Sequence, residues 1–105
     1  MYKLCFFVPL LEKEGVKEAL FALGVGRYEN YDCCSWETEG VGQFRALAGS
    51  TPFIGSENIL EKVVEWKVEM ICRDALIEEA IVALRQAHPY EEPAFEVTRM
   101  EFFGV

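Results

Sequence analysis

Residues 64–72 read Val-Glu-Trp-Lys-Val-Glu-Met-Ile-Cys, with an apolar residue at every even position and mostly charged residues between them. Successive side chains of a strand point to opposite faces of its sheet, so a period of two indicates a strand with one buried face. This is the clearest alternation in the chain. We therefore assign the neighbouring elements outward from it.

A helix is predicted directly after this strand. Asp74 is a residue type that favours a helix N-cap, and Glu78 and Glu79 suit the positive end of a helix dipole. An apolar stripe follows at helical spacing, made of Ile77, Ala80, Ile81 and Leu84. The helix should end near His88, because a proline follows there. Residues 95–102 then predict the last strand.

The preceding half of the chain repeats this order. Residues 2–8 are rich in aromatic and β-branched types and predict a strand that ends at Pro9. Residues 12–23 carry apolar positions at helical spacing, and Gly24 follows where a left-handed cap is wanted. Residues 31–38 predict a further strand. Residues 39–58 are glycine-rich and predict a long loop or an extended hairpin, which is often functional or used in assembly.

Two β-α-β units in sequence predict an α+β fold, a ferredoxin-like βαββαβ sandwich. Its antiparallel sheet would carry both helices on one face, with an extended hairpin joining the second and third strands. The 105 residues fit a single domain, residues 1–105. In this topology the glycine-rich excursion and residues 88–93 share one end of the sheet. The outer strands are about 14 Å apart, so these segments need not touch within one subunit.

Composition limits the partners of this domain. A formal charge of −8 disfavours nucleic acid and anionic membrane surfaces, which would repel it. We expect a cytoplasmic protein, because the apolar first residues predict a strand rather than a secretion signal. The cysteines have no zinc or redox spacing. Cys5 and Cys72 are expected in the core, whereas one of Cys33 and Cys34 should face solvent or a partner.

Residues 88–93 read His-Pro-Tyr-Glu-Glu-Pro and include the only histidine of the chain. Two prolines stiffen this connection and hold an imidazole, a phenol and two carboxylates together. His88 has two interpretations: its ring caps the core and bonds a carbonyl, or it binds a metal or transfers protons. Imidazole and carboxylate suit divalent transition metals, but one local cluster supplies too few ligands. The others would have to come from a second subunit.

Several motifs in order resemble the inserted domain of the NIF-three-like proteins, also called type-two GTP cyclohydrolase homologues, which is similar to the trimeric PII and CutA proteins. The matching segments are residues 24–27, Gly-Val-Gly-Arg; 30–33, Asn-Tyr-Asp-Cys; 40–45, Gly-Val-Gly-Gln-Phe-Arg; 52–55, Pro-Phe-Ile-Gly; and 88–94, His-Pro-Tyr-Glu-Glu-Pro-Ala. The sequence departs from the family pattern at Glu29, Ala46 and Leu47. The family's metal-binding histidines lie in flanking domains, so the resemblance does not imply its hydrolase activity for this chain.

The resemblance implies a homo-oligomer, most simply a trimer, in which aromatic residues of the excursion are buried between subunits. We expect a non-enzymatic module that binds a small ligand or divalent metal at subunit clefts and passes its state to a protein partner. A purely structural or interaction domain and a metal-dependent hydrolase are the alternatives. No catalytic residue is assigned. The candidate ligand-binding residues are His88, Tyr90, Glu91, Glu92, Cys33, Gly40 and Gly42, and the candidate metal ligands are His88, Glu91 and Cys33.

Overall fold

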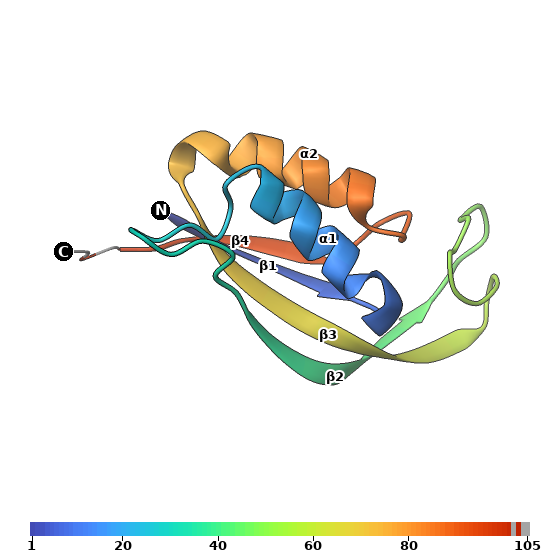
Figure 1. Ribbon diagram of the computed structural model, residues 1–105. Helices are drawn as coiled ribbons and strands as arrows, with labels where there is room; N and C mark the ends of the chain where they lie inside the picture. Colours follow the sequence, from blue (N-terminus) through green and yellow to red (C-terminus); the bar gives the residue numbers. More distant parts are fainter. Residues whose placement is uncertain (102, 104–105) are drawn as a thin grey trace.

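The computed structural model describes residues 1–101 and 103. Its elements are β1 (Tyr2–Val8), α1 (Leu10–Ala22), β2 (Trp36–Arg45), β3 (Leu60–Cys72), the short 3₁₀ turn Asp74–Leu76, α2 (Ile77–Ala87) and β4 (Phe95–Arg99). The strands form one antiparallel sheet in the order β2-β3-β1-β4, and both helices cover the same face of it (Figure 1). This is the α+β, ferredoxin-like arrangement that the sequence predicts. None of the described helices is long and apolar enough to cross a membrane.

Several element boundaries differ from the sequence-based expectation; α1 begins at Leu10 rather than at residue 12, and β3 begins at Leu60 rather than at residue 64. The second strand begins at Trp36 rather than at residue 31, because the chain turns at Glu29 and Cys33, which both adopt positive φ. Asp74 does not cap α2, since its carboxylate binds the Met1 ammonium and Arg99 instead. The last strand ends at Arg99, and position 102 of the predicted strand lies outside the described residues.

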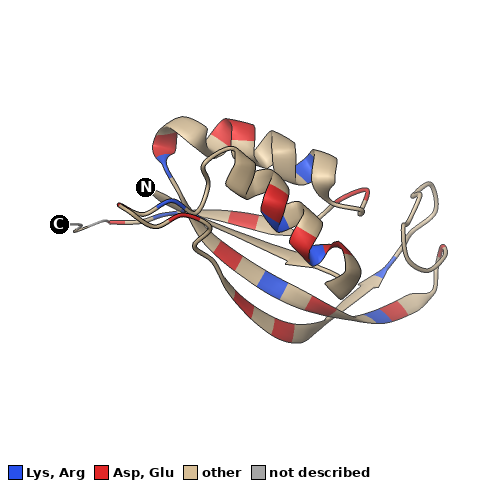
Figure 2. Cartoon of the chain, viewed as in Figure 1, with Lys and Arg blue, Asp and Glu red and all other residues tan. Residues whose placement is uncertain are grey.

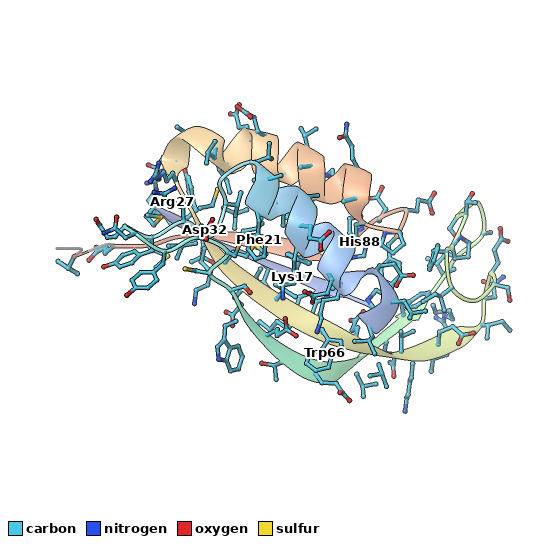
Figure 3. All side chains as sticks on the ribbon, in the orientation of Figure 1. Lys17, Phe21, Arg27, Asp32, Trp66 and His88 are labelled. Atoms are coloured by element: carbon cyan, nitrogen blue, oxygen red, sulfur yellow. The ribbon has the colours of Figure 1, made fainter. Side chains whose placement is uncertain are left out.

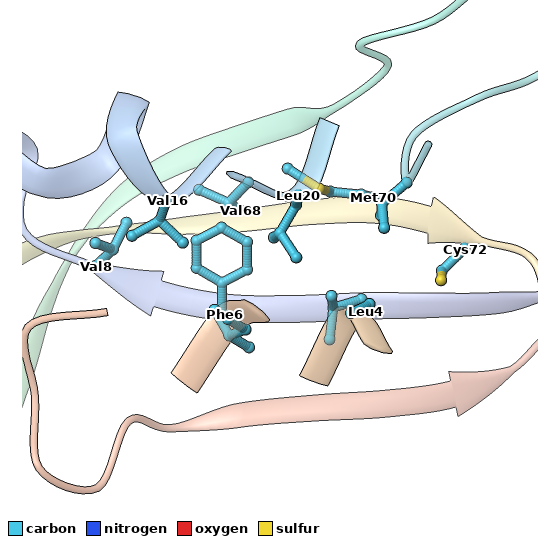
Figure 4. Packing of buried hydrophobic residues seen from close by; sticks show 11 residues of the cluster. Leu4, Phe6, Val8, Val16, Leu20, Val68, Met70 and Cys72 are labelled. Carbon is cyan, nitrogen blue, oxygen red and sulfur yellow. The ribbon is translucent and has the colours of Figure 1, made fainter. Parts of the chain in front are cut away.

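The core lies between the sheet and the helices (Figure 4). It is built from alternate residues of the two central strands and from one face of each helix: Leu4, Phe6, Val8, Val68, Met70, Cys72, Val16, Leu20, Ala80 and Leu84. Cys5 and Cys72 are buried, as predicted. Val64 continues the alternation of β3 but is 57% exposed. The hairpin of β2 and β3 therefore runs on past the core, which makes the molecule elongated, 50 × 24 × 24 Å.

Two lysines tie α1 to the base of this hairpin, and one of them, Lys17, is labelled in Figure 3. The buried Lys13 binds Glu37 of β2, and its ammonium lies 4.0 Å from the centroid of the Trp66 ring of β3. Lys17 donates a second hydrogen bond to Glu37 at 2.8 Å. These hydrogen bonds lower the pKa of Glu37 from its usual value. The hairpin is thus fixed in direction where it leaves the core.

Gly24 ends α1 in a Schellman motif, which confirms its predicted role as a cap. Its φ is +96°, its N–H donates to the Phe21 carbonyl at 3.0 Å, and the Val25 N–H donates to the Leu20 carbonyl at 3.2 Å.

Two glycine replacements on α1 should act in opposite directions. Gly24→Ala should lower the free energy of unfolding by about 1 kcal/mol, because a side chain at positive φ is strained. Gly15→Ala should raise it by about 0.5–1 kcal/mol, because Gly15 is helical and a Cβ there meets open space. Urea unfolding of the two variants beside the parent protein measures both changes. If both replacements changed the free energy of unfolding in the same direction, the assignment of Gly24 as the end of α1 would be contradicted.

Candidate functional site

The 88–94 loop is fixed to the core through the His88 ring. α2 ends at Ala87, and the backbone becomes extended at His88, in front of Pro89. The His88 side chain is only 5% exposed. Its Nε2 lies 2.6 Å from the Phe7 carbonyl oxygen of β1, and the Tyr90 N–H donates to its Nδ1 at 3.1 Å. A carbonyl accepts and an N–H donates, so the ring is neutral with its proton on Nε2.

This geometry matches the interpretation of His88 as a structural cap. Both ring nitrogens bond to the main chain, so neither presents a lone pair to a metal ion. Burial lowers the pKa of His88, although the Phe7 carbonyl and Glu12 oppose that shift. Among the described residues, no three His, Cys, Asp or Glu side chains are placed to hold a metal. Within one chain, the predicted ligands His88, Glu91 and Cys33 do not come together.

Tyr90 lies at the centre of an aromatic cluster. Its ring centroid is 4.8 Å from that of His88, 6.2 Å from that of Phe53 and 6.5 Å from that of Phe44. Its hydroxyl oxygen is buried and interacts with the Glu65 carboxylate, although no hydrogen bond of normal geometry forms with a described residue. Burial, followed by the nearby carboxylates of Glu65 and Glu12, raises the pKa of Tyr90 to about 12. The phenol is therefore neutral at physiological pH.

Glu65 is the carboxylate beside this cluster, and its place depends on a glycine. A Cβ at Gly42 of β2 would clash with the Glu65 carboxylate, so the present position of that carboxylate depends on glycine at this point of the hairpin. Burial raises the pKa of Glu65, and its interaction with Tyr90 partly offsets the shift. Glu65 makes no salt bridge with any residue that the structure describes. Gly40, by contrast, has open space where a Cβ would lie.

The loop at the end of the hairpin folds back onto the 88–94 loop. The Thr51 N–H donates to Glu91 Oε2 at 3.0 Å, and Phe53 reaches Tyr90. Glu92 is exposed and lies 3.8 Å from Arg85 of α2. The expectation that these two segments need not touch within one subunit is therefore wrong. The distance between the outer strands β2 and β4 did not predict this contact, because the loop that joins β2 to β3 reaches across to the 88–94 loop.

A pocket of about 380 Å³ lies between these segments, at the end of the sheet. Its wall is mostly apolar, and its polar groups include Glu65, Tyr90, Glu91 and Glu92. The apolar and aromatic side chains of the wall come from three parts of the chain and include Phe7, Phe44, Phe53, Ile54, Val63 and Ala94. Concave, apolar sites with a few convergent polar groups are typical of small-molecule binding.

The structure divides the sequence-predicted site residues into two groups. The pocket is lined by Tyr90, Glu91, Glu92 and Gly42. His88 does not line it, but accepts a hydrogen bond from the Tyr90 N–H and so helps to position Tyr90. Gly40 is not among the lining residues. Cys33 is exposed and follows Asp32, which lies at the end of the molecule opposite His88 (Figure 3). Glu65 was missed, although its place on the charged side of an alternating strand, opposite two glycines, was a usable signal.

Comparison with known proteins shows which proteins this chain is similar to. No family model matches the chain. A GTP cyclohydrolase 1 type 2 homologue of Mycobacterium tuberculosis is 42% identical over 95 residues, which cover 90% of this chain and 25% of the relative. The crystal structure of a Bacillus cereus protein related to NIF3 has a TM-score of 0.83 and 35% identity, covering 96% of this chain and 26% of that one. This chain is homologous to one segment of the NIF3-related proteins.

The NIF3-related segment also shares its fold with CutA proteins. CutA1 from Pyrococcus horikoshii has a TM-score of 0.72 at 18% identity, covering 99% of this chain and 87% of that one. The PII-like protein CutA from Nostoc has a TM-score of 0.69 at 16% identity, covering 96% and 82%. These identities show a common fold. The chain spans about a quarter of the length of the curated NIF3-related relatives it matches.

Proposed function

We propose that this chain is a non-enzymatic PII-like or CutA-like module, which binds a small ligand in the pocket between the hairpin loop and the 88–94 loop. The observation that carries the proposal is the pocket itself, about 380 Å³ in volume and lined by segments far apart in the sequence. The hydrogen bond from Thr51 to Glu91 joins those segments. A ligand that enters would move both loops, which gives the module a way to pass its state to a protein partner.

We also propose that the module works as a cytoplasmic homo-oligomer, most simply a trimer. The hairpin carries large apolar side chains that the single chain leaves exposed. They are Trp36 at 62%, Val41 at 70%, Leu60 at 55% and Val64 at 57%. The strand register places Val41, Leu60 and Val64 on one face of the hairpin and Trp36 on the other. Exposed apolar residues gathered on one face favour burial against another copy.

Two other functions have weaker support. A divalent metal site would need ligands from a second chain, because both His88 nitrogens are already bonded. We propose no hydrolase activity for this chain, because it matches only about a quarter of the length of the GTP cyclohydrolase 1 type 2 homologues. A purely structural domain is the remaining alternative, and it predicts an empty pocket.

Native mass spectrometry of the protein purified without a metal-affinity tag tests this proposal. One spectrum gives the number of subunits and the mass of any retained molecule. We expect a homo-oligomer that carries a small organic molecule. An oligomer with nothing bound would favour the structural alternative, and a bare monomer would contradict the module altogether.

Gly42→Ala should remove most of the retained molecule, because the new Cβ displaces the Glu65 carboxylate into the pocket. Gly40→Ala is the matched control. It lies two residues away on the same face of β2, where a Cβ meets open space, and should leave the occupancy unchanged. Native mass spectra of both variants measure the two occupancies. Equal occupancy would place the ligand elsewhere.

A further inference from the structure

Three aromatic rings gather in the wall of the pocket, and we call this group of Phe44, Phe53 and Tyr90 the aromatic cage. Phe44, Phe53 and Tyr90 all line the pocket. The Phe44 and Phe53 rings are tilted by 50° and 49° from the Tyr90 ring, so neither is stacked on it. Aromatic faces attract an ammonium group within about 6 Å of the ring centroid. Phe44 comes from β2, Phe53 from the hairpin loop and Tyr90 from the 88–94 loop, so the cage exists only in the folded chain.

The charge inside the pocket is negative. Glu65 lines it from β3, is partly removed from solvent and has no salt-bridge partner among the described residues. Glu91 and Glu92 stand at the rim. The cation among the lining residues is Arg45. Arg45 follows Phe44 on β2, so its side chain points to the opposite face of the strand. A bound anion would therefore be repelled by carboxylates, whereas a bound cation would meet the Glu65 carboxylate, which has no salt bridge among the described residues.

The hydroxyl of Tyr90 adds a directional group. It is buried and interacts with the nearby Glu65 carboxylate, but no hydrogen bond of normal geometry forms between them, so a ligand or water bonded to both groups would be favourable. Its oxygen can accept a hydrogen bond from an N–H group beside Glu65. An ammonium with N–H donors satisfies both acceptors, whereas a quaternary ammonium satisfies neither by hydrogen bonding.

We propose that the pocket binds a small organic ammonium ion, a protonated amine with an apolar body. Its ammonium group lies between Glu65 and the Tyr90 hydroxyl, and its apolar body packs against Phe44 and Phe53. This inference rests on the proposed function, because it names the class of ligand for the same pocket. The net charge of −8 would also raise the concentration of cations near the surface, where Asp and Glu outnumber Lys and Arg (Figure 2).

Isothermal titration with two probes of similar shape tests the charge requirement. Phenethylammonium carries a positive charge at neutral pH, and 2-phenylethanol is its neutral counterpart. The intact protein should bind the ammonium about tenfold more tightly than the alcohol. Glu65→Gln should abolish that preference. Glu61→Gln removes the same charge from the same face of β3, outside the pocket lining, and should preserve it.

The outcomes separate this inference from the proposed function. Equal affinity for the two probes, or an unchanged preference in Glu65→Gln, would overturn the ammonium class and leave a neutral ligand. If neither probe binds, the ammonium inference fails as well. The native mass spectrum then decides independently whether the pocket holds any small molecule. Loss of the preference in both glutamine variants would show that only the net charge of the protein matters, which also overturns the proposal.

Discussion

Replacing Phe6 with alanine should lower the free energy of unfolding by about 3–5 kcal/mol. Phe6 is fully buried on β1, the strand at the centre of the core. Its ring lies beside Val16, Leu20 and Val68 (Figure 4). The variant loses the burial of the ring and leaves a cavity that the helices and sheet cannot close completely.

Chemical denaturation with both urea and guanidinium measures this loss. Val82→Ala is the control on α2, because Val82 is 55% exposed and its truncation should change the free energy by no more than about 0.5 kcal/mol. Losses of similar size in the two variants would contradict the assigned core.

Replacing His88 with alanine should lower the free energy of unfolding by about 2–4 kcal/mol. The change leaves the Phe7 carbonyl and the Tyr90 N–H without their partner, and each unsatisfied buried group costs about 1–3 kcal/mol. The His88→Gln variant should lose less stability than His88→Ala, because the glutamine amide can still donate a hydrogen bond to the Phe7 carbonyl. The Tyr90 ring should also lose its fixed position, so the pocket should weaken together with stability. Equal stability of the His88→Ala variant and the parent would contradict the structural role of His88.

The contribution of His88 should depend on pH. Burial lowers its pKa in the folded state below the ordinary value of 6.5, so the unfolded chain binds the proton more strongly. The stability from the neutral ring is therefore fully present above pH 6.5 and is lost as the pH falls through the folded pKa. The difference between the parent and His88→Ala should shrink from about pH 7 to about pH 5. If the stability difference between the parent and His88→Ala instead grows as the pH falls, the folded state favours the charged ring.

The sequence pattern predicted the central part of the fold well, because burial there follows simple periodicity. Val68, Met70 and Cys72 face the core as the alternation requires, and Gly24 ends α1 as its backbone freedom allows. The start of β2 was not predictable in the same way. Tyr31 and the two cysteines that follow are compatible with a strand, but positive φ at Cys33 keeps residues 31–35 out of the sheet.

The site was only half predictable. The composition of the 88–94 loop marked it as a candidate, and its prolines indicated a stiff connection. Periodicity gives no information on how a long loop folds back, so the contacts of Thr51 and Phe53 with this loop could not be foreseen. Gly42 was singled out by the resemblance, but its physical reason, the space that Glu65 needs, requires coordinates.

The central claim is that the hairpin loop and the 88–94 loop of one chain form the pocket. Nuclear Overhauser spectroscopy on chains with labelled aromatic residues, diluted into an excess of unlabelled chains, tests it most directly. Cross-peaks between the Tyr90 ring and the rings of Phe53 and Phe44 should persist on dilution, because both contacts lie within one chain. Loss of these cross-peaks on dilution would show that the rings meet between subunits, and their absence in every sample would show that the pocket does not form.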